Sequence, residues 1–230
     1  MPAREFKQVR TNKPLMPPTL VNVAVGVLIG VSLLGAAFDR RSLAVVAVTA
    51  ALPDFDAALS LVIHGATNAV LHSAFVPLAA AAFLYWDTER REESWLRSRY
   101  GWYGVRVAWV AVAGYAVAGI GLDLFNIESV AVLYPLSNDY YAIVGKFVLS
   151  TQEGVIQTYV EFGNSILSVR TVGTTESRHI ASWVNPTAGT GNPSDAERVF
   201  RIVDSAWQLV VVIGAIAAIP AKFAVEGGRH

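Results

Sequence analysis

The stretch Leu20–Phe38, "LVNVAVGVLIGVSLLGAAF", decides the class of this protein because it is apolar and carries no charged side chain. A bilayer core about 30 Å thick is crossed by about 20 apolar helical residues. Residues 57–86, 107–122 and 205–221 also lack charge. Of the 230 residues, 53% are hydrophobic and only 16% are charged. The composition therefore predicts an all-α integral membrane protein.

Working outward from that stretch, we predict about four transmembrane helices, at Leu20–Phe38, Ala69–Trp86, Val105–Phe125 and Val203–Ala221. Ser42–Leu52 is apolar but too short to cross, and Pro53 follows it. We therefore expect a short re-entrant or buried helix there. The basic residues before Leu20 resemble those of a signal peptide. The uncharged run is longer than an h-region of about 7–15 residues, which favours a retained span, with cleavage as the alternative.

The rest of the chain predicts a small polar region outside the membrane. We divide the chain into a membrane part at 1–149, a polar extracytoplasmic loop at 150–202, and a last helix with its tail at 203–230. Gly154–Phe162 and Ser165–Thr175 are rich in β-branched residues that roughly alternate with polar ones, so we expect short strands. Asp87–Arg106 is charged and aromatic, which suits an amphipathic helix on the membrane surface.

The distribution of basic residues predicts the orientation. If Ser42–Ile63 is re-entrant, the basic residues of the N-terminus, of 87–106 and of the C-terminus share one side. The positive-inside rule makes that side cytoplasmic, with both termini, and puts 39–68 and 126–202 outside. The expected localisation is the cell membrane, with the lipid bilayer as partner. The net charge of zero argues against a nucleic-acid surface, and the lack of cysteine excludes disulfides.

Ionisable residues lie within or beside these apolar stretches. Asp54 and Asp56 follow Pro53, His64 and His72 lie before and within the second predicted span, and Asp123 lies near the end of the third. Burying such groups unpaired costs several kcal/mol, so they are functional candidates. In the predicted topology they meet at one depth. Carboxylates and imidazoles are ligands of zinc, manganese and iron, so the sequence predicts a divalent metal site formed by Asp54, Asp56, His72 and Asp123.

Simpler interpretations stay open for some of these residues. Asp54 can cap a helix after the proline turn. His64 suits an interfacial histidine, although His64, Asn68 and His72 share one helical face if that segment is helical. We keep His64, Asn22 and Asn68 as weaker candidates.

Three segments give the chain a resemblance to a known family. They are "ALPDFD" (Ala51–Asp56), "HS" (His72–Ser73) and "GIGLDLFNIESVAVLYPLS" (Gly119–Ser137). In order and spacing they resemble the prokaryotic membrane-bound metal-dependent hydrolases of the YdjM-like group, over roughly Val21 to Tyr141. Asn22 stands where that pattern has a histidine. Thr67 or Asn68 stands at a second histidine position.

The resemblance implies a membrane-bound metal-dependent hydrolase. Its substrate would be an ester or a phosphoester at the outer membrane face, and a lipid-like one suits that depth. The replaced histidines leave an alternative, a catalytically inactive member that serves as a membrane scaffold or partner-binding protein. A small transporter is a third possibility, but we find no inverted repeat in the sequence.

Overall fold

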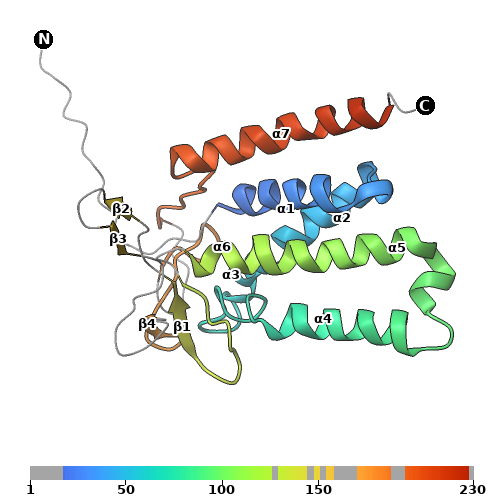
Figure 1. The fold of residues 1–230 in the computed structure, drawn as a ribbon. Helices are drawn as coiled ribbons and strands as arrows, with labels where there is room; N and C mark the ends of the chain where they lie inside the picture. Colours follow the sequence, from blue (N-terminus) through green and yellow to red (C-terminus); the bar gives the residue numbers. More distant parts are fainter. Residues whose placement is uncertain are drawn as a thin grey trace, which may run out of the picture.

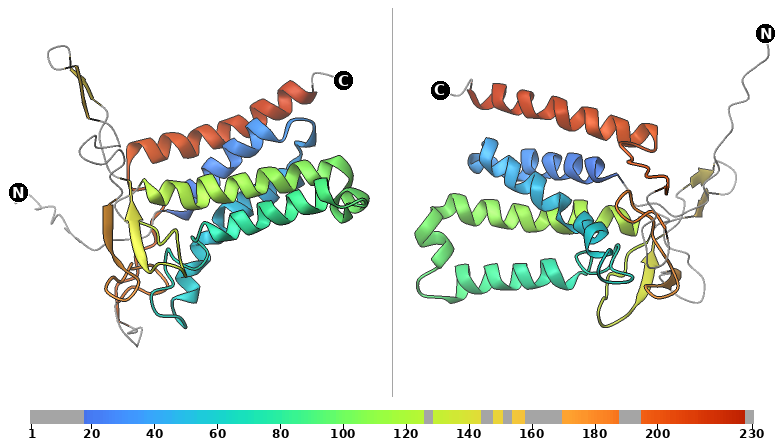
Figure 2. Two further views of the ribbon diagram at one scale, coloured as in Figure 1. Left: turned by 60° about the horizontal axis from the view of Figure 1, so that its bottom comes forward. Right: turned by 180° about the vertical axis from the view of Figure 1, so that it is seen from behind.

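The computed structural model describes residues 18–125, 129–143, 148–150, 154–157, 170–187 and 195–227. Five helical rods lie side by side, with the strands gathered at one end (Figure 1). We call this end, where Asp54, Asp123 and the strand β1 meet, the cap end. The opposite end carries Asp39–Arg41 and the loop that follows Tyr85, and we call it the basic end. Figure 2 shows the same layout from two other sides.

The first two rods pack closely because small residues line their contact. α1 (Thr19–Leu33) starts after Pro18 at the cap end, and η1 (Gly35–Ala37) follows it. α2 (Arg40–Ala51) runs back, and its first turn is capped by Asp39, which accepts a hydrogen bond from Ser42 N at 2.7 Å. A Cβ added to Gly26 would lie 2.5 Å from Ala50 Cβ. Glycine on α1 thus permits the close approach typical of membrane helix pairs.

The helix predicted at Ser42–Leu52 is longer than expected. α2 continues through η2 (Leu52–Phe55) into α3 (Asp56–Leu59), and Arg40–Leu59 is long and apolar enough to cross a membrane. Pro53 does not end the rod, because it occupies the first turn of the 3₁₀ helix η2, where its missing N–H is tolerated. Because the chain turns between α1 and α2, this second rod runs antiparallel to α1.

The third and fourth rods also differ from the prediction. α4 (Phe75–Tyr85) and the π-helical turn η3 (Trp86–Arg90) form the third rod, and residues 60–74 before it are irregular, so the expected span from Ala69 starts too early. α5 (Trp95–Gly114) kinks at Gly101 and continues through η4 (Tyr115–Gly121) into α6 (Leu122–Leu124). Within the segment Asp87–Arg106, part of which we predicted as a surface helix, Trp95–Tyr100 is helical and is separated from the rest of α5 by the break at Gly101.

The cap consists of short strands, as expected from the β-branched segments. β1 (Asp139–Ala142) pairs antiparallel with β4 (Arg170–Thr174), and β2 (Val148–Ser150) pairs antiparallel with β3 (Gly154–Gln157). The remainder of the two predicted strand segments, 158–162 and 165–169, lies outside the described residues. α7 (Ala206–Gly227) follows the cap and packs against α1.

Contacts at the basic end show which ends of the rods lie together. Tyr103 donates a hydrogen bond to Asp39 at 3.0 Å, so residue 39 lies beside the start of α5 and not at the opposite end from it. The rings of Phe38 and Phe223 lie 4.8 Å apart, so α7 ends where α1 ends. The first described residue and the last therefore lie at opposite ends of the bundle, whereas the sequence predicted both termini on one side.

By length and composition, three helices qualify as membrane-crossing among the described residues. They are Arg40–Leu59, Trp95–Leu124 and Ala206–Glu226, with α1 a shorter apolar helix. The protein is thus a mostly helical chain with apolar rods and two small sheets at the cap end.

Candidate metal centre

Asp54 lies at the cap end because of the turn that Pro53 starts. It belongs to η2 and is 8% exposed. Asn22, one turn into α1 and fully buried, donates a hydrogen bond from its side-chain nitrogen to Asp54 Oδ1 at 3.1 Å. Gly119 allows the fourth rod to reach this turn, because a Cβ there would lie 2.5 Å from Pro53 Cγ. Three rods thus meet around one carboxylate.

Asp56 organises the irregular segment between α3 and α4. It is fully buried, and its carboxylate accepts backbone hydrogen bonds from Ala69 at 3.1 Å, Leu71 at 2.8 Å and His72 at 3.3 Å. Its Oδ2 also lies 3.0 Å from His72 Nδ1. A carboxylate oxygen beside Nδ1 favours a proton on that nitrogen of the imidazole. The other ring nitrogen, Nε2, is then left with its lone pair.

His72 Nε2 points at two further carboxylates. It lies 2.9 Å from Asp123 Oδ2 and 3.8 Å from Asp54 Oδ1. Asp123 lies on α6 at the end of the fourth rod and is fully buried. One ligand atom from each of Asp54, His72 and Asp123 lies within 4.8 Å of the others. Two carboxylates and one imidazole, turned toward one point, have the geometry of a site for a cation.

Several polar atoms of this cluster are left without a hydrogen bond. Asp123 Oδ1 and the side-chain oxygens of Asn22 and Asn68 are buried and lack a hydrogen-bond partner, and the Nε2 of His72 and Asp123 Oδ2 have only their contact with each other at 2.9 Å. Buried polar atoms are rarely orphaned, because each costs about 1–3 kcal/mol. A lone pair of Nε2 facing two carboxylates is also repulsive. A second proton on His72, a proton on Asp54 or Asp123, or a bound cation relieves this repulsion.

The charges of the cluster are compatible with a bound cation. With His72 protonated and all three carboxyl groups ionised, two negative charges are uncompensated, which is costly in a dry interior. With a divalent ion and neutral His72, one negative charge remains, that of Asp56, which three backbone N–H groups stabilise. The donor set of oxygen and imidazole nitrogen suits zinc, manganese or iron.

The other residues that the sequence suggested, Asp56, Asn68 and His64, are not part of the group formed by Asp54, His72 and Asp123. Asp56, predicted as a ligand, instead contacts His72 from behind, the place of a carboxylate that orients a metal-binding histidine. Asn68 is fully buried with a positive φ of 54°, and its amide donates to Ser129 O at 3.2 Å. His64 is exposed in the irregular segment and lies outside the cluster.

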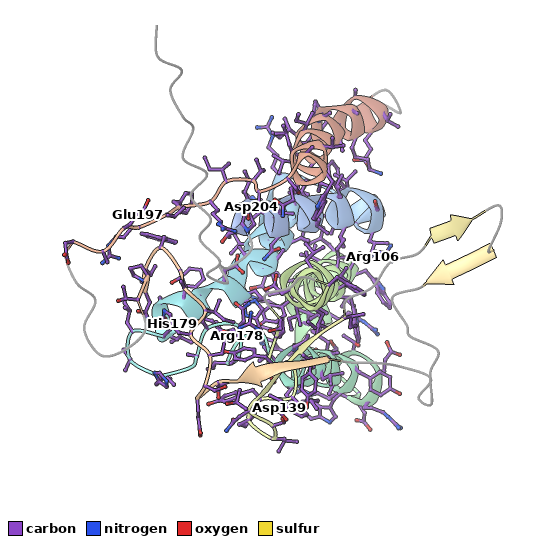
Figure 3. All side chains as sticks on the ribbon, turned by 90° about the vertical axis from the view of Figure 1, so that its left-hand side faces the viewer. Arg106, Asp139, Arg178, His179, Glu197 and Asp204 are labelled. Carbon is purple, nitrogen blue, oxygen red and sulfur yellow. The ribbon has the colours of Figure 1, made fainter. Side chains whose placement is uncertain are left out.

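The sequence did not predict the pocket that opens beside Asp54. Its lining comes mainly from the cap and includes Ser182, Trp183, Val199, Phe200 and Arg201. The rings of Trp183 and Phe200 meet edge to face, with centroids 5.8 Å apart. These residues lie far from Asp54 in the chain, and no motif marks them. Arg178 and His179 precede the lining residue Ser182 in the chain, and Figure 3, seen from the cap end, shows both side chains at this end of the bundle.

Comparison with known families adds to this geometry. Residues 18–188, well over half of the chain, match the family described as YdjM inner membrane protein. The chain belongs to this family. The match includes Asn22, Asp54, His72 and Asp123 and ends before α7. No curated protein and no solved structure matches the chain.

Family membership agrees with the apolar rods. The protein is an inner membrane protein, and the lipid bilayer is its surroundings. The family description names no reaction, so the chemistry of the cluster has to be argued from its residues.

Proposed function

We propose that Asp54, His72 and Asp123 bind a divalent zinc, manganese or iron ion, and that the protein is a membrane-bound metal-dependent hydrolase. The observation that carries the proposal is the direction of His72 Nε2. It faces two buried carboxylates, and the second oxygen of Asp123, Oδ1, has no hydrogen-bond partner. Such a centre supplies a water ligand whose pKa is lowered toward about 7 and polarises a bound carbonyl or phosphoryl oxygen.

The residues around the ligands have supporting roles in this proposal. Asp56 holds the His72 ring with its proton on Nδ1, which keeps Nε2 available. Asn22 donates to Asp54 and fixes the orientation of that carboxylate. The three ligands come from η2, α6 and the irregular segment, so any movement of one rod changes their spacing.

The pocket beside Asp54 suggests the substrate. It has a volume of about 50 Å³, enough for a few water molecules, and Asp54 is the one ligand that lines it. Trp183 and Phe200 give its rim a large exposed apolar surface, at 52% and 66% exposure. We propose an ester or phosphoester with an apolar chain, in which the chain lies on these rings and the reacting bond faces Asp54. A lipid-like molecule has this form.

The orientation that we propose places the cap end outside. The basic end carries Arg40, Arg41 and, around the loop after α4, a further group of arginines, which the positive-inside rule assigns to the cytoplasm. The basic residues before α1 lie outside the described residues. Because the chain has no cysteine, single-cysteine variants can test this directly. In spheroplasts an impermeant maleimide should label Leu136→Cys at the cap end and not Ser98→Cys at the basic end.

The test of the function is metal content together with hydrolysis. Full-length protein purified in detergent is analysed for metals and assayed on p-nitrophenyl esters, bis-p-nitrophenyl phosphate and a short-chain phospholipid. We expect about one equivalent of metal in the wild type and in His64→Ala, and none in His72→Ala. No metal above background in the wild type would disprove the proposal. Metal without any hydrolysis would favour the scaffold alternative.

A further inference from the structure

A second cavity lies at the basic end, far from the candidate metal centre. It has a volume of about 520 Å³ and opens between the turn after α1 and the first part of α5. The turn contributes residues 34–37, and α5 contributes Trp102, Tyr103 and Arg106. The metal proposal makes no use of this cavity.

Arg106 is the charged residue of the cavity. Its Nε donates to Leu33 O at 2.7 Å, which satisfies a carbonyl at the end of α1 and fixes the side chain across the two rods. The side chain is exposed, and its neighbours Val105 and Val107 are buried against the core. Figure 3 shows Arg106 at the outer edge of the bundle.

The charge of Arg106 is not balanced within the described part of the chain. No acid there forms an ion pair with it; the nearby Asp39 accepts instead from Tyr103 and from Ser42 N. Arg106 also lies within Trp95–Leu124, a segment apolar enough to cross the membrane. A guanidinium has five donors in a planar fork, and one is used here. An exposed arginine near the end of such a segment pairs favourably with anionic lipid head groups.

We expect lipid around the exposed face of Arg106, and the cavity suits a lipid head group. Trp102 and Tyr103 are 68% and 41% exposed, and such rings belong at the level of the head groups. Leu33, which is 45% exposed, extends the apolar surface toward the membrane. A phosphodiester pairs well with a guanidinium through two parallel hydrogen bonds.

We propose that this cavity binds one phospholipid of the membrane. The phosphate of the lipid contacts Arg106, its glycerol region lies against Trp102 and Tyr103, and its acyl chains run along α1 and α5. A membrane phospholipid is preferred to soluble phosphate because the site combines a cation with exposed apolar surface inside a membrane-crossing segment. The binding links α1 to α5 and does not depend on the proposed hydrolase activity.

The experiment is lipid retention by the full-length protein. Purified wild type in detergent is titrated with phosphatidylglycerol and followed by native mass spectrometry, with inorganic phosphate at millimolar concentration as competitor. We expect one lipid to be retained, and roughly tenfold weaker retention in Arg106→Gln. Arg99→Gln, an exposed arginine of the same helix outside the cavity, is the matched control and should bind as the wild type does.

Two results would overturn the proposal. One is equal retention by the wild type and Arg106→Gln. The other is displacement of the lipid by inorganic phosphate, which would identify a soluble anion as the ligand. Metal content is measured on the same samples, because a folded Arg106→Gln protein should keep its cap-end metal. If Arg106→Gln does not fold, Trp102→Ala tests the same cavity and should also weaken retention.

Discussion

Buried carboxylates lie at both ends of the bundle, and they differ in how their oxygens are satisfied. At the basic end, Asp87 accepts hydrogen bonds from Arg91 Nη1 at 3.0 Å, Trp95 N at 3.0 Å, Ser94 Oγ at 2.7 Å and Leu96 N at 3.0 Å. At the cap end, Asp123 Oδ1 has no hydrogen-bond partner, and Oδ2 contacts only His72 Nε2, at 2.9 Å. A carboxylate that the fold satisfies has a structural role, here closing the turn before α5. One left unsatisfied is a candidate ligand.

Among the tests of this comparison, removing the proposed cation should change the stability of the protein most. A ligand present at about 1,000 times its Kd stabilises a protein by about 4 kcal/mol. For a chain of this size we expect a chelator to lower the unfolding temperature of the wild type by roughly 10 °C. His72→Ala should not respond to the chelator, and His64→Ala should respond as the wild type does. Thermal unfolding with and without EDTA checks this; a wild type indifferent to EDTA would contradict the assignment.

Asp56→Asn tests whether Asp56 orients His72 or binds the metal itself. The amide cannot accept all the N–H groups that the carboxylate accepts, so the His72 ring loses its fixed orientation. We expect the metal to bind roughly 10–100-fold more weakly, as on loss of an orienting partner. Competition with a chromophoric chelator measures this. Asp139→Asn, in the cap, is the control, and an unchanged affinity in Asp56→Asn would contradict the role.

Gly119→Ala tests whether the site depends on the approach of two rods. The new methyl group would meet Pro53 Cγ at 2.5 Å and Ala50 O at 3.0 Å, and so push the fourth rod away from η2. Such overpacking costs about 1–3 kcal/mol. We expect a lower unfolding temperature and weaker metal binding together. In the control Gly214→Ala, nothing lies within 4 Å of the new Cβ, and helix propensity predicts a slight stabilisation.

Asp87→Asn should lower the stability of the protein least among these variants. It should not change the metal content. Burial alone raises the pKa of the Asp87 carboxyl, but hydrogen bonds from Ser94 and from the backbone of Leu96 and Trp95 outweigh it and hold the pKa at about 2. We expect the unfolding temperature to fall by roughly 5 °C at neutral pH. Loss of metal from this variant would contradict the separation of the two ends.

The pH dependence of the Asp87 contribution follows from the direction of the shift. The pKa is lower in the folded protein than the ordinary value of 3.8, so the stabilisation is complete above about pH 4. It is lost as the pH falls toward 2. The difference in stability between the wild type and Asp87→Asn should therefore shrink over that interval, and acid unfolding of the two proteins measures it.

The residues of the candidate site could be picked out from the sequence, because charge inside an apolar stretch is conspicuous. Asp54, His72 and Asp123 are separated widely along the chain, yet the structure brings them within 4.8 Å. The separate position of Asp56 was not predictable. Its role depends on the irregular backbone of residues 66–72, which no periodicity encodes.

The topology was predicted less well, for a reason that lies in one residue. Pro53 was interpreted as the end of a short helix, whereas η2 accepts it in its first turn and the rod continues to Leu59. The rod that contains η2 runs the full length of the bundle. Relative to the loop after α4, α1 therefore runs in the opposite direction to the predicted one. A positive-inside count made with the shorter helix therefore gives α1 the opposite direction relative to that loop.

The π-helical stretch η4, Tyr115–Gly121, lies immediately before Asp123. A wide turn of this kind holds about one residue more than an α-helical turn, and one residue corresponds to about 100° of rotation about the helix axis. Tightening η4 to the ordinary pitch would swing Asp123 around the rod, away from His72. The direction in which this carboxylate points is thus set by the winding of the backbone that precedes it.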